Sequence, residues 1–516
     1  MSATRLPEPV DLRARRFALL VVAGLLAAAG VAYELSLLLL GTVTVGATER
    51  ANAVVLGAAM AGMGAGAAFG GRLAGRPVRA FVGVEVALAI LGAAAAPGLY
   101  WLWASLDTFW GPLLVVAFAI GACIGAEMPL LAALNDQLAR QRAASVVAKL
   151  TAADYLGAFL GAIAFAFAVR PVLGLVGATM AIAAVNLLLA AAVPIVMGVP
   201  LRQGALVVPG ALVLAGMVVA APSVVDDGRQ ALYRDPILAV DDRGRSDIVV
   251  TERRHRDGRR DTRLFLDGDL QLSSVDSYRY HEALVHPAIA AAPDRDLDVL
   301  VLGGGDCAAV TEALRHDTVA SVTLVELDPR VTDAVGDVEG FDELSAGCDD
   351  ARTEVITADA FEWIRRTDRS FDVLVTDFPD PDTAALGRLY SVELFVAARS
   401  VLASDGSLSV QCGSPWFAQA AYWTCAATLE EAGWSSTPYL ADVPSFGTWG
   451  FHLAVPDGPA PLVAATEPPG ARYWDRSVAA GSMVLPLDLL VERDQEPTTV
   501  LEPRIVDAHQ RAWFDY

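Results

Sequence analysis

The chain has 516 residues, of which 54% are hydrophobic and 19% charged, and its formal net charge is −22. This length allows two or three domains. The negative charge argues against a nucleic-acid partner, because phosphate contacts require a basic surface. Apolar residues are concentrated before about residue 225, and most acidic residues follow it. We therefore expect a multi-pass α-helical membrane domain over residues 1–224, followed by a soluble part.

Seven apolar segments approach the roughly 20 residues that a membrane span requires. They are residues 17–40, 53–74, 80–103, 110–134, 152–168, 173–197 and 205–221. Cationic residues lie before the first segment and in alternate loops: Arg5, Arg13, Arg15 and Arg16, then Arg72, Arg76 and Arg79, then Arg140, Arg142 and Lys149. The positive-inside rule places the N-terminus in the cytoplasm. With seven spans, the soluble part would lie on the opposite side of the membrane from the N-terminus. If one short segment were re-entrant or interfacial, the soluble part would instead lie in the cytoplasm.

Four acidic residues fall inside these segments: Glu34, Glu85, Glu127 and Asp154. Ionisable groups cost free energy in a bilayer and are candidates for function. Two interpretations remain open for them. They could lie near span ends or hydrogen-bond between helices, or they could form part of a cation pathway.

The five cysteines are Cys123, Cys307, Cys348, Cys412 and Cys425. None forms a C-x-x-C pair, and none has zinc-ligand spacing with a histidine. We therefore expect reduced thiols and no structural metal.

The soluble part begins with short β-like runs, which predict a small β domain over residues 225–275. Asp267-Gly268 lies between two such runs and predicts a tight strand–turn–strand connection. A helical segment is expected over residues 280–292.

A nucleotide-site pattern follows. An apolar strand over residues 298–302 leads into Gly303-Gly-Gly-Asp-Cys307, then a helix, then a strand that ends at Glu326. Glycines let the backbone approach a ligand, and the acid binds the ribose hydroxyls. The pattern predicts a Rossmann-like (methyltransferase-type) α/β domain over residues 276–516. It does not distinguish NAD from an adenosyl-sulfonium ligand.

Two further predicted strands also end in acids, at Asp359 and Asp377, and Asp380 follows closely. The carboxyl ends of parallel strands meet at one edge of a sheet. We therefore expect these acids to converge with Asp306 and Glu326 in one crevice. One such acid usually caps a helix, but five at successive strand ends are harder to explain in that way.

The order of these motifs resembles that of the spermidine synthase family. The motifs are Leu266-Asp-Gly…Gln271, Tyr280-His-Glu282, His286-Pro287, Gly303-Gly-Gly-Asp306, Val325-Glu-Leu-Asp328, Asp359-Ala-Phe361, Asp377-Phe-Pro-Asp-Pro381 and Gln411-Cys-Gly-Ser-Pro-Trp416. The resemblance covers roughly residues 247–454. The whole architecture is similar to the membrane-attached bacterial polyamine aminopropyltransferases.

This resemblance implies decarboxylated S-adenosylmethionine as donor and a diamine, usually putrescine, as acceptor, with no cofactor. It implies Asp377 as the proton acceptor. The polyamine side would comprise Tyr280, His281, Asp306 and Asp380, and the donor side Ser246, Gln271, Gly303, Gly305, Glu326, Asp359 and Ala360. The expected partners are these small molecules and the lipid bilayer, with a homo-oligomer possible. Because the donor is made in the cytoplasm, we expect the catalytic domain at the cytoplasmic side of the cell membrane.

The sequence departs from the family pattern at four positions. Cys307 and Ala308 replace two glycines, Ser246 stands where a glutamine is usual, and Val443 is nearest to the position of a tyrosine. Because of these departures, the sequence supports the predicted donor more strongly than it supports a particular acceptor.

Three other functions compete with this interpretation. A methyltransferase would use the same sheet, but Asp306 would repel the carboxylate of the intact donor. A polyamine transporter or sensor with a non-catalytic binding domain would account for the intramembrane acids. An NAD-dependent dehydrogenase is weakest, because no dyad for hydride transfer stands out.

Overall fold

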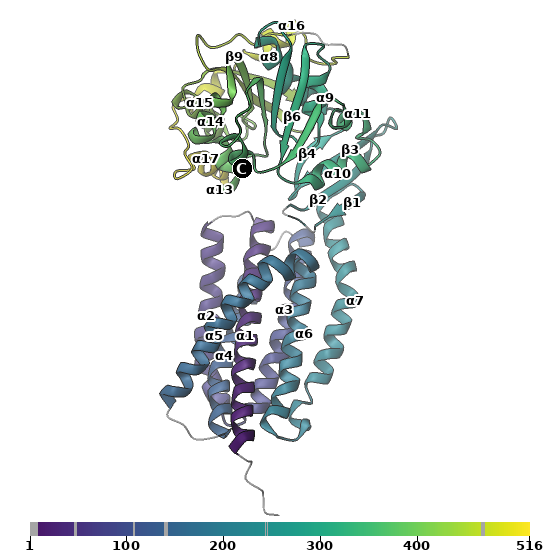
Figure 1. Cartoon of the computed structure of the whole chain (residues 1–516). Coiled ribbons are helices and arrows are strands. Elements are labelled where there is room, and N and C mark those ends of the chain that lie inside the picture. Colours follow the sequence, from purple (N-terminus) through teal and green to yellow (C-terminus); the bar gives the residue numbers. More distant parts are fainter. Residues whose placement is uncertain are drawn as a thin grey trace, which may run out of the picture. The chain divides into compact units, whose positions relative to one another are not determined.

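The computed structural model describes residues 9–45, 49–106, 109–138, 143–242, 244, 246–465 and 470–515. The chain forms two compact units, Met1–Arg234 and Asp235–Tyr516 (Figure 1). The first is helical, and the second contains all the strands in the described residues. Each unit has its own hydrophobic core.

The described residues of the first unit form seven long helices. They are α1 (Pro9–Val45), α2 (Glu49–Leu73), α3 (Pro77–Leu106), α4 (Trp110–Leu138), α5 (Ala143–Ala164), α6 (Arg170–Met197) and α7 (Val207–Leu232), with a π-helical turn at Phe165–Val169 and a 3-10 turn at Leu201–Gly204. Six continuous stretches are long and apolar enough to cross a membrane, and one of them, Val146–Met197, has 52 residues. At 1.5 Å per residue that stretch would be far longer than the roughly 30 Å hydrocarbon core.

The contacts of small residues show the direction of the paired helices. A Cβ at Gly62 would lie 2.1 Å from the Phe118 carbonyl oxygen, and one at Gly66 would lie 1.9 Å from that of Ala122, so α2 and α4 run parallel. Gly157 meets Gly24 in the same way, and Gly161 meets Ala28, so α1 and α5 are also parallel. These glycines therefore let the paired helices approach closely.

The other pairings complete the path. Asn186 of α6 donates a hydrogen bond to Glu85 of α3. Ala178, which precedes Asn186, packs in the same cluster as Ala95, which follows Glu85. The order of contacts is therefore reversed, and α6 runs antiparallel to α3. Gly210 of α7 packs on Val86, and Gly228 packs on Tyr100, so α7 is parallel to α3. The 52-residue stretch therefore passes along the bundle twice, reversing near Gly174, where the backbone is not helical.

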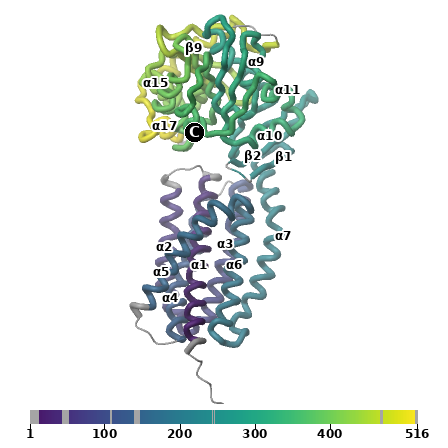
Figure 2. Tube along the Cα trace, viewed as in Figure 1, coloured from purple at the N-terminus to yellow at the C-terminus, as the bar shows by residue number. Residues whose placement is uncertain are grey.

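The seven helices thus alternate in direction, and α1 begins at the end of the bundle opposite to that at which α7 ends (Figure 2). Helix α7 continues to Leu232, past the boundary that we placed at residue 224, because Gly228 and its buried neighbour Arg229 still pack within the bundle.

The second unit opens with an antiparallel sheet in the order β1-β2-β3-β4. Its strands are β1 (Ile237–Asp241), β2 (Ile248–Arg254), β3 (Arg260–Leu266) and β4 (Asp269–Ser273). Asp267 and Gly268 join β3 to β4 with φ of 52° and 100°. These left-handed values suit an Asp-Gly turn, as the sequence predicts.

A seven-stranded mixed sheet follows, in the order β10-β11-β9-β8-β5-β6-β7. Its strands are β5 (Leu297–Gly303), β6 (Val319–Glu326), β7 (Thr353–Thr357), β8 (Phe371–Asp377), β9 (Leu402–Gln411), β10 (Ser435–Val443) and β11 (Gly447–Val455). Strands β5 to β9 pair in parallel, and β10 and β11 are antiparallel. The carboxyl ends of β8, β5, β6 and β7 therefore lie side by side.

Helices cover both faces of this sheet. The helices of this unit are α8 (Ser277–Ala291), α9 (Ala308–Leu314), α10 (Pro329–Asp337), α11 (Asp342–Ser345), α12 (Ala360–Ile364), α13 (Ala384–Gly387), α14 (Val392–Val401), α15 (Gln419–Glu431), α16 (Arg476–Ser482) and α17 (Arg504–Asp515), and α10 packs on the four-stranded sheet instead. Val299 and Val301 of β5 pack with α8 and α9, whereas Leu300 and Leu302 pack with α12, α14 and α15. This alternation follows from the two-residue period of a strand.

The cysteines correct one expectation. We expected reduced thiols, but Cys307 is joined to Cys348, and Cys412 to Cys425, with Cα–Cα distances of 5.7 and 6.3 Å. The two cysteines of each pair are 41 and 13 residues apart, and these spacings match no recognised sequence motif. Each pair is therefore brought together only by the fold.

Candidate active site

The glycine turn after β5 allows two acidic strand ends to approach it closely. A Cβ at Gly304 would lie 2.9 Å from Asp377 Oδ2, and one at Gly305 would lie 2.8 Å from the Glu326 carboxylate. Gly303 and Gly304 have φ of 75° and 71°, which side chains rarely adopt. Any larger residue here would push the backbone away from the sheet edge.

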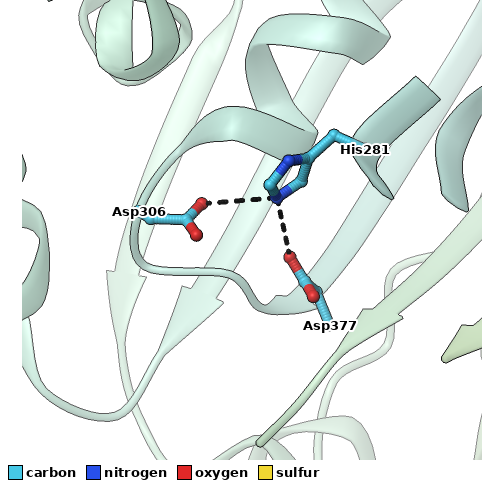
Figure 3. Close-up of side chains that lie close together, drawn as sticks. All are labelled: His281, Asp306 and Asp377. Carbon is cyan, nitrogen blue, oxygen red and sulfur yellow. Dashed lines mark ion pairs between the residues drawn. The ribbon is translucent and has the colours of Figure 1, made fainter. Parts of the chain in front are cut away.

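Three titratable side chains meet beside this turn (Figure 3). His281 Nε2, from α8, lies 3.8 Å from Asp306 Oδ1 and 3.7 Å from Asp377 Oδ2. The other ring nitrogen, Nδ1, lies 2.9 Å from the Ser277 carbonyl oxygen. Because a carbonyl only accepts, Nδ1 carries a proton and Nε2 faces the two carboxylates. Asp306 Oδ1 also accepts a bond of 2.9 Å from the Ala308 N–H, so this acid caps the start of α9 as well.

Tyr280 links this group to an aromatic wall. Its hydroxyl donates to Asp377 Oδ1 at 2.7 Å. Phe446 and Trp449 lie edge-on to its ring, with centroids at 5.9 and 6.3 Å. Charged and apolar surfaces therefore adjoin, as a molecule with an ammonium group on an alkyl chain would require.

Burial raises the pKa of Asp377 to about 6, and the negative charge of Asp306 adds to the rise, while His281 and the Tyr280 hydrogen bond oppose it. A carboxyl whose pKa is near the working pH can both accept and release a proton. Perturbed acids of this kind are common at functional sites.

Glu326, at the end of β6, faces the glycine turn. Its Oε1 accepts a bond of 2.8 Å from the Asp328 N–H. Burial raises its pKa, although backbone N–H bonds oppose the rise. Glu326 lies beside Gly305, and its ribose-binding role stays a prediction.

The remaining donor-side residues are less directly connected. Asp359 caps α12 through the Glu362 N–H and pairs with Arg388, and Ala360 is buried next to it. Gln271 Nε2 bonds to the Asp269 carbonyl at 3.5 Å. Ser246 accepts from Arg330 through its backbone carbonyl. These contacts do not join the side chains of Gln271 or Ser246 to the His281 group.

Asp380 belongs to a second acidic group. His509 Nε2, from α17, lies 3.5 Å from Asp380 Oδ2. Burial lowers the pKa of His509, but the hydrogen bond and charge of Asp380, together with Asp382 and Asp269, raise it overall. Burial, with Asp382 and Asp380, raises the pKa of Asp269 to about 6. This group was not predicted, because His509 lies far along the chain.

Gln411 is another residue whose role the sequence did not indicate. Its side-chain nitrogen donates to the Phe378 carbonyl and to the Tyr390 hydroxyl, and its oxygen accepts from Trp449 Nε1 at 3.1 Å. It thereby fixes the backbone immediately after Asp377. Its position at the end of β9, next to the buried strand ends of the site, was the available signal, because buried polar groups need partners.

The structure locates three of the departures from the family pattern. Cys307 has φ of 66°, a left-handed value that glycine adopts most readily, and Ala308 is buried at the start of α9. Val443 is buried at the end of β10, and Phe446 and Trp449 of the same hairpin supply the aromatic surface near Tyr280.

His281, Asp306 and Asp377 offer three ligand atoms within 4.8 Å of one another. Such a group could hold a metal ion or the ammonium group of an amine. The donor set alone, one imidazole and two carboxylates, does not distinguish these.

The comparisons with known proteins identify the family. Residues 277–462 match the model of the spermine/spermidine synthase domain. The chain is 42% identical to polyamine aminopropyltransferase 1 of Streptomyces coelicolor, over 99% of this chain and 97% of that one. It is 37% identical to the polyamine aminopropyltransferase of Mycobacterium tuberculosis, over 96% and 97%. This chain belongs to the polyamine aminopropyltransferase family.

Among solved structures, spermidine synthase from Thermotoga maritima matches half of this chain and 87% of its own, at 23% identity and a TM-score of 0.43. The matches to polyamine aminopropyltransferases extend over nearly the full length, so they include the helical first unit. Membership in this family confirms the resemblance drawn from the motifs.

Proposed function

We propose that this protein transfers an aminopropyl group from decarboxylated S-adenosylmethionine to a diamine, with putrescine as the first candidate. The products would be spermidine and methylthioadenosine. The observation that carries the proposal is the buried group of His281, Asp306 and Asp377 beside a glycine turn that also meets Glu326. One end of this site suits a cationic amine and the other an adenosine.

The acceptor nitrogen would attack the carbon next to the sulfonium sulfur. The new C–N bond forms as the C–S bond breaks, and the electron pair of that bond neutralises the sulfur. An alkyl amine has a pKa near ~10.4, so it must lose a proton before or during attack. Asp377 would take this proton on Oδ2, while the Tyr280 hydroxyl holds the carboxylate in place through Oδ1.

We propose no metal for this reaction, because a sulfonium is already a good leaving group. The three ligand atoms at His281, Asp306 and Asp377 would instead surround an ammonium group. Dialysis against a chelator should leave turnover unchanged. A loss of turnover that Mg²⁺ or Zn²⁺ restores would show that the group holds a metal.

The deciding experiment for the activity is mass spectrometry of products. The purified full-length protein would be incubated with the decarboxylated donor and a panel of diamines, and with the intact donor in parallel. A mass increase equal to one aminopropyl group supports the proposal and names the acceptor. A methylated product would instead identify a methyltransferase, and binding without any product would favour a sensor or transporter.

We further infer that the catalytic unit lies on the side of the membrane away from the cytoplasm. The second unit follows α7 directly in sequence, and α7 ends opposite the start of α1. Most of the cationic loop residues predicted from the sequence belong to the end of the helical bundle at which α1 begins, and the positive-inside rule places that end in the cytoplasm. Arg5, Arg140 and Arg142 lie outside the described residues. Disulfides such as Cys307–Cys348 persist mainly in oxidising compartments.

This inference departs from our expectation of a cytoplasmic enzyme, which rested on the origin of the donor. A reporter fused after Tyr516 tests it, with a second reporter placed after residue 75 in the α2–α3 loop as control. The first should behave as external and the second as cytoplasmic. The reverse result would return the catalytic unit to the cytoplasm.

A further inference from the structure

The helical unit contains a buried group of polar side chains that the proposed reaction does not use. Its members come from four helices: Tyr33 from α1, Glu85 from α3, Glu127 from α4 and Asn186 from α6. Glu85 and Asn186 are 0% exposed, Tyr33 is 1% exposed, and Glu127 is 6% exposed. Polar groups so deep in an apolar bundle cost free energy unless they are compensated.

These side chains contact one another. Asn186 Nδ2 donates a hydrogen bond of 2.9 Å to Glu85 Oε2. The carboxyl groups of Glu85 and Glu127 interact directly, and the Tyr33 hydroxyl interacts electrostatically with both. Gly92 makes room for Tyr33, because a Cβ there would lie 2.7 Å from the hydroxyl oxygen.

The group has more acceptors than donors. Glu85 Oε1, Glu127 Oε1, Asn186 Oδ1 and the Tyr33 hydroxyl are all buried and have no hydrogen-bond partner in the described part of the chain. Carboxylate and amide oxygens can only accept, so three of these four atoms call for a donor or a cation. The amide nitrogen of Asn186 already donates a hydrogen bond to the other oxygen of Glu85, Oε2.

No basic side chain compensates the two acids. Across the described residues, no ion pair joins Glu85 or Glu127 to an Arg, Lys or His. The other titratable groups that interact with the pair are Tyr33, Cys123 and Asp154, and none of them supplies a positive charge. Two adjacent buried carboxylates cannot both remain ionised without a counter-ion.

We propose that Glu85 and Glu127, with the side-chain oxygens of Tyr33 and Asn186, bind one small monovalent cation, either H⁺ or Na⁺. Both ions suit a set of oxygen atoms, and both are compact enough for carboxyl groups that touch each other. Intramembrane carboxylates that bind and release ions are the means by which membrane proteins couple ion gradients to other processes. The helical unit would then do more than anchor the enzyme.

Infrared difference spectroscopy of the full-length protein in lipid bilayers tests this site. A protonated carboxylic acid has a C=O band that a carboxylate lacks. The sample would be perfused with buffers of different pH at fixed Na⁺, and then with and without Na⁺ at fixed pH, with K⁺ as the balancing ion. Glu85→Gln and Glu127→Gln assign the band, and Glu34→Gln is the control from a half-buried acid of the same bundle.

A band that follows pH alone, and is lost in Glu85→Gln or Glu127→Gln but kept in Glu34→Gln, identifies a proton site. A band that also disappears when Na⁺ is added identifies a site at which Na⁺ displaces the proton. If the wild-type protein shows no exchange with either ion, the pair is a fixed structural element and the proposal fails. The wild-type measurement decides this even if a variant does not fold.

Discussion

The Tyr280 hydroxyl donates a hydrogen bond of 2.7 Å to Asp377, and the two residues are 97 positions apart in the sequence. Helix α8 contributes the first and the end of β8 the second. The bond occupies Oδ1 of Asp377, while Oδ2 faces His281. This bond orients the carboxylate and leaves Oδ2 to accept a proton, and positioning of this kind accounts for much of the rate of group transfer.

Replacement of the base tests its role. Asp377→Asn should reduce turnover by at least ~100-fold while donor binding is largely retained, because the amide cannot accept the proton. Steady-state kinetics and calorimetry measure the two quantities. Asp368→Asn, an exposed acid just before the same strand, is the matched control. Near-normal turnover of Asp377→Asn would remove this residue from the mechanism.

The preference for the decarboxylated donor should depend on Asp306. At an effective dielectric of ~20, two like charges ~4 Å apart repel by about 4 kcal/mol, and half of that disfavours the intact donor by more than tenfold at ~1.4 kcal/mol per decade. Asp306→Asn should narrow the difference in affinity between the two donors, measured by calorimetry. Because its Oδ1 also bonds to the Ala308 N–H, an unchanged preference would leave this acid only its capping role.

The pH dependence of kcat/KM should have an acid limb that reflects Asp377. Its pKa is raised to about 6, so the protonated, inactive form gains population as the pH falls through that value. Asp306 contributes to the rise, so Asp306→Asn should move the limb to lower pH. Rate profiles of the wild type and variant test the sign of this shift. A limb that moves to higher pH would contradict the electrostatic account.

His509 should control acceptor binding. When protonated it pairs with Asp380, so below its raised pKa it competes with the acceptor's ammonium for that carboxylate. His509→Gln should therefore lower KM for the diamine at acidic pH, with a smaller effect at alkaline pH and little change in kcat. Asp507→Asn, on the exposed face of the same helix, is the control. An equal change in KM at every pH would indicate a packing role instead.

Glu282 should contribute to the free energy of unfolding and not to the chemical step. Its buried carboxylate accepts from the backbone N–H groups of Arg472, Tyr473 and Trp474 at 2.7–2.8 Å. Each unsatisfied N–H costs about 1–3 kcal/mol, so Glu282→Ala should lower the unfolding free energy by ~3 kcal/mol or more. Thermal unfolding of the full-length protein measures this. Glu339→Ala, which removes an exposed ion pair with Arg260, should have little effect.

Local sequence patterns were sufficient to predict the two-part organisation, the glycine turn and the acids at strand ends. Each of these depends on local pattern: apolar length for the helices, period-two alternation for the strands, and positive φ for Gly303 and Gly304. The parallel order of the strands then brings Asp306, Asp377 and Glu326 to one edge of the sheet. Motif order was sufficient to predict the family.

The contacts between distant residues could be read only from the folded chain. The disulfides, the pairing of His509 with Asp380, and the contact of Glu85 with Asn186 join positions 13 to 129 residues apart. No local periodicity encodes such pairs, because they depend on how whole elements pack. The direction of α5 and α6 was likewise fixed by small-residue contacts with α1 and side-chain contacts with α3, since a continuous apolar run does not mark where the chain turns back.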